Sequence, residues 1–269
     1  MKLNKTLTAS ALLAMLPIAG NASTIVYQNT FDDGDISSNT AGIGGGLSQE
    51  ITGGNGFTVV QGSIVADTSA NNNRAFGFST NTFDLSNGFT LDFTANASAL
   101  GNASANRFSV GLAAAGADFA TFSNDGRNFL GDNRAAFESV GIDFTVDQGQ
   151  GLNYNDGFGN PSVAPDPTGT VTVLSNAQTI TAGADLAVSL TVAADGSYSY
   201  SINGAPATTG EAFGLDLNQE YHFATYFQDD IGDFSISEVT LTALAAVPEP
   251  SSTALLGLGG LALILRRKK

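Results

Sequence analysis

The sequence predicts an all-β protein whose body is one antiparallel two-sheet sandwich, and three observations support this prediction. Glycine is abundant, with 32 in 269 residues, and Asn, Ser and Thr recur along the chain, which is typical of short strands joined by turns. Hydrophobic residues make up 42% of the chain, enough for a sizeable core. These residues alternate or cluster in short runs between Gly, Asn and Asp, without a long helical stripe.

The candidate strands follow one another along the body. The first six cover residues 24–31, 57–65, 74–78, 89–95, 108–113 and 136–146. The strongest hairpin signal lies at 186–202, where alternating apolar residues flank Asp195-Gly196, a pair favoured in tight turns. Residues 221–227 and 234–244 complete the set. The alternation in 234–244 breaks once, which indicates a β-bulge.

Two glycine-rich stretches, 42–56 and 149–169, are interpreted as long loops. The second contains three prolines and could pass for a domain linker, but the strands on either side are too few to close two separate sandwiches. We therefore expect one sandwich domain over residues 23–246. It lies between a signal peptide at 1–22 and a sorting segment at 247–269.

The first 22 residues have the three parts of a secretory signal peptide. Lys2 and Lys5 form the positive start, and residues 7–18 are an apolar stretch too short to span a bilayer comfortably. Small residues then place the cleavage site between Ala22 and Ser23. This order predicts a removable signal helix and export, and a buried N-terminal helix is the alternative.

The C-terminal end has its own three-part pattern. It begins with the residues Val247, Pro248, Glu249 and Pro250, whose prolines hold the chain extended. The uncharged residues 253–265 would form a transmembrane helix of roughly 20 Å, short of the roughly 30 Å hydrocarbon core of a bilayer. The chain closes with the basic residues Arg266, Arg267, Lys268 and Lys269. The positive-inside rule keeps such a cluster in the cytoplasm.

This ending resembles the PEP-CTERM protein-sorting signal of exported proteins from Gram-negative bacteria, which commonly make extracellular polysaccharide and biofilm. The resemblance implies that, after passage through the secretion machinery, an exosortase recognises Pro248-Glu249-Pro250 and processes the protein near this motif. The protein would be anchored transiently in the inner membrane and then reach the cell surface or the extracellular space. An ordinary tail anchor with a chance motif is the alternative.

The formal net charge of −15 conceals a strong asymmetry between the body and the ends. Residues 23–246 hold 24 of the 25 acidic residues and only four of the ten basic ones, which gives this body a net charge of −20. Such a surface repels phosphate backbones, so no nucleic acid is expected as a partner. The lack of cysteine excludes disulfides, thiolate zinc sites and cysteine catalysis.

The strand order of the body is similar to that of the concanavalin A-like, laminin G-like jelly-roll family. This resemblance is one of pattern, and it rests on the segments VYQNTFDDGD, LAVSLTVAADGSYSYSING and FSISEVTLTAL. It implies that the first and last strands pair and that two antiparallel sheets stack. In this family, sugars, proteins or calcium bind at loops or on the concave face.

Two acidic clusters suggest a calcium site. They comprise Asp32, Asp33 and Asp35 after the first predicted strand, and Asp229, Asp230 and Asp233 before the last. If these strands pair antiparallel, both clusters meet at one rim and offer the oxygen ligands that calcium prefers. The competing interpretation is that Asp is simply a favoured turn residue in an acidic protein. No other cofactor is expected.

Sugar binding needs aromatic platforms beside polar groups, and the chain has no Trp. The best candidates are Tyr154 and Phe158, with Asn153, Asn155 and Asp156 nearby. An ordinary glycine-rich loop is the alternative interpretation of this segment.

Catalytic motifs are missing from the sequence. It has no G-x-S-x-G elbow, no E-x-D-x-x-E strand of retaining glycosidases and no zinc helix. The only histidine, His222, lies in an alternating strand and is better explained as a satisfied or solvent-facing residue than as a base.

We therefore expect an exported, exosortase-sorted surface or matrix protein with a non-catalytic sandwich that binds extracellular polysaccharide. Two alternatives stay open. One is a secreted glycan-active hydrolase with an unfamiliar carboxylate pair that includes Glu138 or Glu220, and the other is a purely structural component of the biofilm matrix.

Overall fold

The computed structural model describes residues 22–52, 56–66, 74–97, 107–116, 138–145, 149–156, 171–177, 183–205, 208–210, 215–228 and 234–246. Residues Ala22–Ala245 form one compact unit. Every regular element within the described ranges is a strand, and no helix there could cross a membrane. The predicted signal helix and transmembrane helix lie in residues 1–21 and 247–269, outside the described residues.

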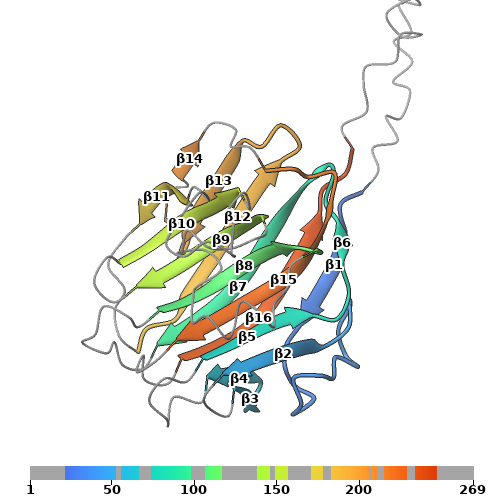
Figure 1. The fold of residues 1–269 in the computed structure, drawn as a ribbon, viewed down its shortest axis with the longest axis vertical. Coiled ribbons are helices and arrows are strands. Elements are labelled where there is room, and N and C mark those ends of the chain that lie inside the picture. Colours follow the sequence, from blue (N-terminus) through green and yellow to red (C-terminus); the bar gives the residue numbers. More distant parts are fainter. Residues whose placement is uncertain are drawn as a thin grey trace, which may run out of the picture. The chain divides into compact units, whose positions relative to one another are not determined.

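The strands form two antiparallel sheets that overlap as two layers (Figure 1). The first sheet has the order β14 (Thr208–Gly210), β13 (Tyr198–Ile202), β12 (Leu186–Ala193), β7 (Gly88–Ala97), β16 (Phe234–Ala243), β4 (Ser63–Ala66) and β3 (Phe57–Val60), with β1 (Thr24–Asn29) also on β16. The second has the order β11 (Val171–Ala177), β10 (Gly149–Asp156), β9 (Glu138–Thr145), β8 (Arg107–Ala114), β15 (Glu220–Gln228), β5 (Arg74–Ser79) and β2 (Leu47–Thr52), with β6 (Phe83–Asp84) also on β15. The predicted all-β, two-sheet fold is confirmed.

The core lies between the sheets because each strand directs alternate apolar side chains inward. Tyr27 of the first sheet stacks on Phe223 of the second, with ring centroids 5.1 Å apart. Phe57 and Phe227 meet edge to face at 4.9 Å. These contacts join the two layers through large, fully desolvated rings.

Two sequence signals placed their strands correctly. The hairpin β12–β13 turns at Gly196, whose φ is 79°, and Val192 lies opposite Tyr198. In β16 the register shifts between Ser237 and Thr240, where Glu238 has a φ of 54°. This bulge explains the broken alternation, because it lets Ile236 and Val239 both face the core.

Three other predictions of strands and loops are wrong. The single strand expected at 57–65 is the hairpin β3–β4, with Gln61 and Gly62 both at positive φ, as the favoured two-residue turns require. The expected loop at 42–56 contains β2, and the expected loop at 149–169 begins with β10. Glycine marked these segments as loops, but backbone pairing to both neighbours overrides that signal in β10.

The expected pairing of the first and last strands is confirmed. Thr24 of β1 lies opposite Ala243 of β16, so the first and last strands of the body are neighbours in the first sheet. This placement brings β1 close to β6 of the second sheet, which the ribbon also shows (Figure 1). The candidate site lies where these two strands approach each other.

Candidate functional site

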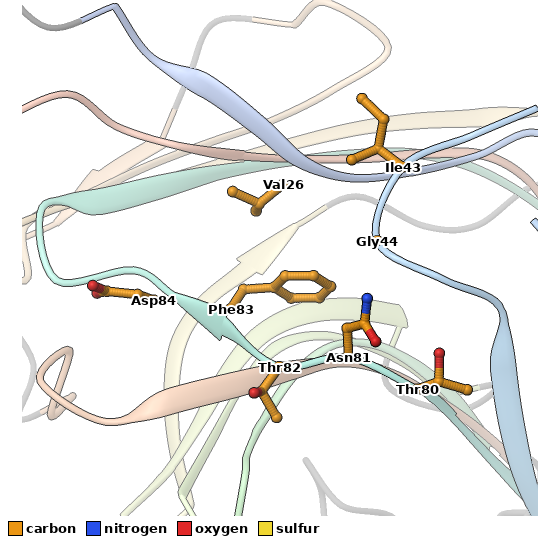
Figure 2. A pocket seen from close by; sticks show the side chains of 8 residues that line it. All are labelled: Val26, Ile43, Gly44, Thr80, Asn81, Thr82, Phe83 and Asp84. Atoms are coloured by element: carbon orange, nitrogen blue, oxygen red, sulfur yellow. The ribbon is translucent and has the colours of Figure 1, made fainter.

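An open pocket of about 670 Å³ lies between β1 of one sheet and β6 of the other, and we call it the Phe83 pocket. Its lining consists of Val26, Ile43, Gly44, Thr80, Asn81, Thr82, Phe83 and Asp84. Figure 2 shows Val26 and Ile43 on one side and the run Thr80–Asp84 on the other, with the Phe83 ring between them. The pocket therefore has an apolar wall and a polar wall.

The floor of the pocket is anchored in the core. Phe83 pairs with Tyr221 across β6 and β15, and only 6% of its surface is exposed. Its ring lies 5.8 Å from the ring of Tyr27, which in turn stacks on Phe223. This column of rings fixes the position of the floor.

The apolar wall is a loop that is held to β1 by hydrogen bonds. The amide of Ile43 donates to the carbonyl oxygen of Gln28, and the amide of Gln28 donates to that of Ile43, both at 3.0 Å. The side-chain amide of Asn39 donates to the same Gln28 oxygen at 2.9 Å and to the Gly45 oxygen at 2.8 Å. Gly44 has a φ of 88°, and an added Cβ would lie 2.6 Å from the Val26 oxygen, so only glycine fits there.

The first acidic cluster organises the start of this loop. Asp33 accepts hydrogen bonds from the amide of Thr40 at 2.6 Å, from its hydroxyl at 2.8 Å and from the Ser38 hydroxyl at 3.1 Å. These bonds, the Thr40 amide first, hold the pKa of Asp33 below its usual value. Asp35 accepts from the amide and hydroxyl of Ser37. The turn-forming role weighed against calcium is thus present in this half of the predicted site.

The calcium hypothesis itself stays a prediction. The antiparallel pairing that it requires is present in β1 and β16. Its other half, Asp229, Asp230 and Asp233, lies outside the described residues. Among the residues that the structure does describe, no group of three His, Asp or Glu side chains could hold a metal ion.

The polar wall is a turn with both fixed and available groups. The amide of Thr80 donates to the Gly46 oxygen at 2.9 Å, and the Ser79 hydroxyl donates to the Asn81 oxygen at 2.7 Å. Asp84 accepts from the amide of Ser86 at 2.9 Å, which lowers the pKa of Asp84 and keeps it ionised at neutral pH. Within the described ranges, the side chains of Asn81 and Thr80 make no hydrogen bond.

Negative charge dominates the surroundings of the pocket. Asp84 is in the lining, and the hydroxyl of Thr82 donates to the exposed carboxylate of Glu220 next to it. None of the described residues that line the pocket is a lysine or an arginine. The site can therefore offer hydrogen bonds and an acceptor charge to a ligand, but no cationic anchor.

The other carboxylate of the hydrolase hypothesis is enclosed in a network that we call the Glu138 cluster. Glu138 is 9% exposed and accepts hydrogen bonds from the amide of Asp216 at 2.8 Å, the hydroxyl of Tyr221 at 3.0 Å and the side chain of Gln219. Burial, and then the negative charge of Glu138, raise the pKa of Tyr221 far above its usual value, so its hydroxyl stays a donor.

The remaining predicted residues lie elsewhere in the second sheet. Nδ1 of His222 lies 2.7 Å from the carbonyl oxygen of Ser79 and donates to it, because a carbonyl oxygen can only accept. His222 is thus a satisfied strand histidine, as the sequence indicated.

Tyr154 and its neighbours Asn153, Asn155 and Asp156 lie in β10, between β9 and β11, so the loop placement expected for them is wrong. Phe158 lies outside the described residues. Sugar binding by this segment stays a prediction.

The C-terminal end of the chain has a counterpart among known protein families. Residues 246–269 match the family model described as the PEP-CTERM protein-sorting motif. The chain carries a PEP-CTERM sorting motif. The match includes the predicted Val247, Pro248, Glu249 and Pro250, and it confirms the resemblance drawn from these residues. A comparison with curated protein sequences finds no match.

The body of the chain is similar to several solved structures. The Emp46p carbohydrate recognition domain in its potassium-bound form gives a TM-score of 0.52 at 12% identity, over 72% of this chain and 87% of that one. The Emp47p carbohydrate recognition domain gives 0.50 at 14% identity, over 83% and 97%. LamAcat from Zobellia galactanivorans gives 0.50 at 10% identity, over 81% and 97%. These likenesses show a jelly-roll, lectin-like fold.

The Phe83 pocket was not predicted from the sequence. Its polar wall comes from residues 79–84, with the sequence STNTFD. This run of small polar residues joins the end of β5 to β6 and contains a single aromatic residue, Phe83. That run was the available signal. The partner loop at 42–46 gave none, because its glycines indicated only a turn.

Proposed function

We propose that this PEP-CTERM protein is exported, processed by an exosortase, and acts at the cell surface or in the extracellular matrix as a non-catalytic polysaccharide-binding protein. The observation that carries the binding part is the Phe83 pocket, an open site with an apolar wall and with polar side chains, Thr80 and Asn81, that make no hydrogen bond among the described residues. Pockets of this kind, with volumes of about 300–1,000 Å³, are the default binding sites of proteins. The lectin-like fold and the sorting motif support the same proposal.

The non-catalytic part is supported by how the candidate catalytic groups are used. Glu138 accepts three hydrogen bonds inside the protein, and His222 donates to a backbone carbonyl. Glycoside hydrolysis needs two carboxyl groups on either side of an accessible bond. A carboxylate enclosed like Glu138 is poorly placed for this chemistry.

A direct test uses the full chain in a zwitterionic detergent, which avoids sugar-containing detergent headgroups. The chain is applied to an array of bacterial and plant polysaccharides, and each bound polysaccharide is then incubated with the protein and assayed for new reducing ends. We expect binding without release of reducing ends. Release that disappears in a Glu220→Gln variant would support the hydrolase instead, and an absence of any binding would support the structural component.

The sorting part makes a separate prediction. In the native host, the mature protein is expected to begin at Ser23 and to lack the basic residues after position 265, because both ends are addresses that processing removes. Mass spectrometry of the secreted protein checks both ends. A Pro248→Ala/Glu249→Ala/Pro250→Ala variant should remain in the membrane fraction with its tail intact. Equal release of this variant and the wild type would contradict the role assigned to the motif.

A further inference from the structure

We infer that the Phe83 pocket binds an uncharged sugar unit of a polysaccharide, with the Asn81 amide and the Asp84 carboxylate as its main hydrogen-bonding groups. This inference rests on the proposed polysaccharide-binding function and deepens it by naming the residues and the ligand class. It is carried by three properties of the pocket, which are its mixed walls, its unpaired polar groups and its charge.

The walls match the two surfaces of a sugar ring. A pyranose has an apolar face of C–H groups and a rim of hydroxyls, so its site needs an apolar platform beside polar side chains. Ile43 is 46% exposed and, together with the half-buried Val26, offers this platform above the Phe83 floor. Figure 2 shows Asn81 on one side of the Phe83 ring and Asp84 on the other, with the Asp84 carboxylate at the rim of the pocket and directed away from the ring.

The polar groups offer both kinds of hydrogen bond. The Asn81 amide is a donor and an acceptor, the Thr80 hydroxyl is both, and the ionised Asp84 is an acceptor. Asp84 accepts from the Ser86 amide through one carboxylate oxygen, and the Ser86 side chain also hydrogen-bonds to this carboxylate; the group is exposed and can still accept from a ligand. A sugar hydroxyl also donates and accepts, so this set can satisfy neighbouring hydroxyls at once. A purely apolar ligand would leave these groups unpaired.

The charge of the pocket selects against acidic sugars. Asp84 lines the pocket, Glu220 lies beside Thr82, and the lining residues that the structure describes include no basic side chain. The body as a whole has a net charge of −20, which repels a polyuronate before it reaches the site. An uncharged hexose polymer meets neither penalty.

The pocket is also preorganised. The apolar wall is fixed by the paired Gln28 and Ile43 backbones, and the polar wall is tied to it by the bond from Thr80 to Gly46. Ligand binding then orders few protein groups, which lowers its entropic cost.

The test measures binding of the full chain to immobilised polysaccharides by biolayer interferometry in a zwitterionic detergent. The probes are a neutral glucan, a neutral mannan, a polyuronate and a cationic glucosamine polymer. Asn81→Ala removes an exposed side chain that makes no hydrogen bond in the described structure, so its fold should be intact. The matched control is Asn87→Ala, which changes an equally exposed asparagine in the next turn that does not line the pocket.

We expect the wild type to bind at least one neutral polysaccharide and not the polyuronate. Asn81→Ala should weaken this binding by about five- to tenfold, the effect of one hydrogen bond, and Asn87→Ala should bind as the wild type does. Asp84→Asn keeps the acceptor for the Ser86 amide but removes the charge, and it should weaken neutral-glycan binding as well.

The outcomes separate this inference from the proposed function. If the wild type binds a neutral polysaccharide and both pocket variants bind it equally well, the pocket is not the site, and the general function stands. If only the polyuronate or the glucosamine polymer binds, the ligand class is wrong. If no polysaccharide binds, the inference and the proposed function both fail.

Discussion

The Glu138 cluster and the Phe83 pocket contain the same kinds of groups, a carboxylate, an amide and hydroxyls, but use them in opposite ways. In the Glu138 cluster both carboxylate oxygens accept hydrogen bonds from within the chain. In the Phe83 pocket, the side chains of Asn81 and Thr80 have no hydrogen-bond partner in the described ranges. The two regions are neighbours, because Tyr221 of the cluster, in β15, pairs with Phe83 of the pocket, in β6.

The difference follows from burial. A buried polar group without a partner costs about 1–3 kcal/mol, so an enclosed cluster must satisfy every group internally. An exposed group is satisfied by water and can exchange that water for a ligand. The Glu138 cluster therefore contributes mainly to stability and the Phe83 pocket mainly to binding, and substitutions in each should affect chiefly that property.

The largest effect is expected for Glu138→Ala. The change leaves the Asp216 amide and the Gln219 side chain without their acceptor in a partly buried site and removes the buried bond from Tyr221, which should lower the free energy of unfolding by about 2–3 kcal/mol. For a domain of this size the melting temperature should fall by roughly 5–10 °C. Differential scanning calorimetry measures this, and neutral-glycan binding at 20 °C below the transition should be retained.

The matched control is Glu220→Ala. Its carboxylate is exposed and accepts one bond, from Thr82, so the stability change should stay below about 0.5 kcal/mol. A Glu138→Ala protein as stable as the wild type would break the comparison, because the cluster would then not stabilise the fold.

The strands with the clearest sequence signals are those whose apolar residues alternate regularly or with a single break. The hairpin β12–β13 and the bulge in β16 were visible because each buried position is large and apolar, as in Leu190, Tyr200 and Val239. Burial of such residues depends only on the period of the sequence. The fold class and the sorting motif could be predicted for the same reason, since both are local patterns.

The candidate site could not be predicted in this way, because its residues meet only through the tertiary fold. Phe83 and Ile43 are 40 positions apart. They line one pocket because Ile43 is hydrogen-bonded to β1 of one sheet, and β1 lies close to β6, which carries Phe83, in the other sheet. The acidic cluster at 32–35 is ambiguous in the sequence for a related reason. Asp33 binds Thr40, seven residues away, and the spacing alone does not distinguish such a turn from a metal ligand.

An intermediate effect is expected for Asn39→Ala, which should lower both the stability of the fold and the affinity for glycan. The Asn39 amide donates to the Gln28 oxygen of β1 and to the Gly45 oxygen of the loop, and so it holds the loop on the strand. Its loss should lower the free energy of unfolding by about 1–2 kcal/mol. It should also weaken neutral-glycan binding, because Ile43 and Gly44 lose their support. Asn96→Ala, which removes one exposed bond to Asp185, is the control and should change neither property much. Wild-type affinity in Asn39→Ala would show that the apolar wall does not need this support.

The smallest effect concerns acid pH. Hydrogen bonds from Thr40 and Ser86 lower the pKa values of Asp33 and Asp84 in the folded protein. A carboxyl group with a lowered folded pKa contributes stability that is present above its unfolded pKa, about 3.9, and is lost as the pH falls through the folded value. The melting temperatures of the wild type, Asp33→Asn and Asp84→Asn should therefore differ slightly from pH 7 to pH 5, and the differences should shrink as the pH falls below about 3.9. Parallel curves over the whole range would mean that neither carboxylate charge stabilises its turn, and the pocket wall would then depend on its backbone bonds alone.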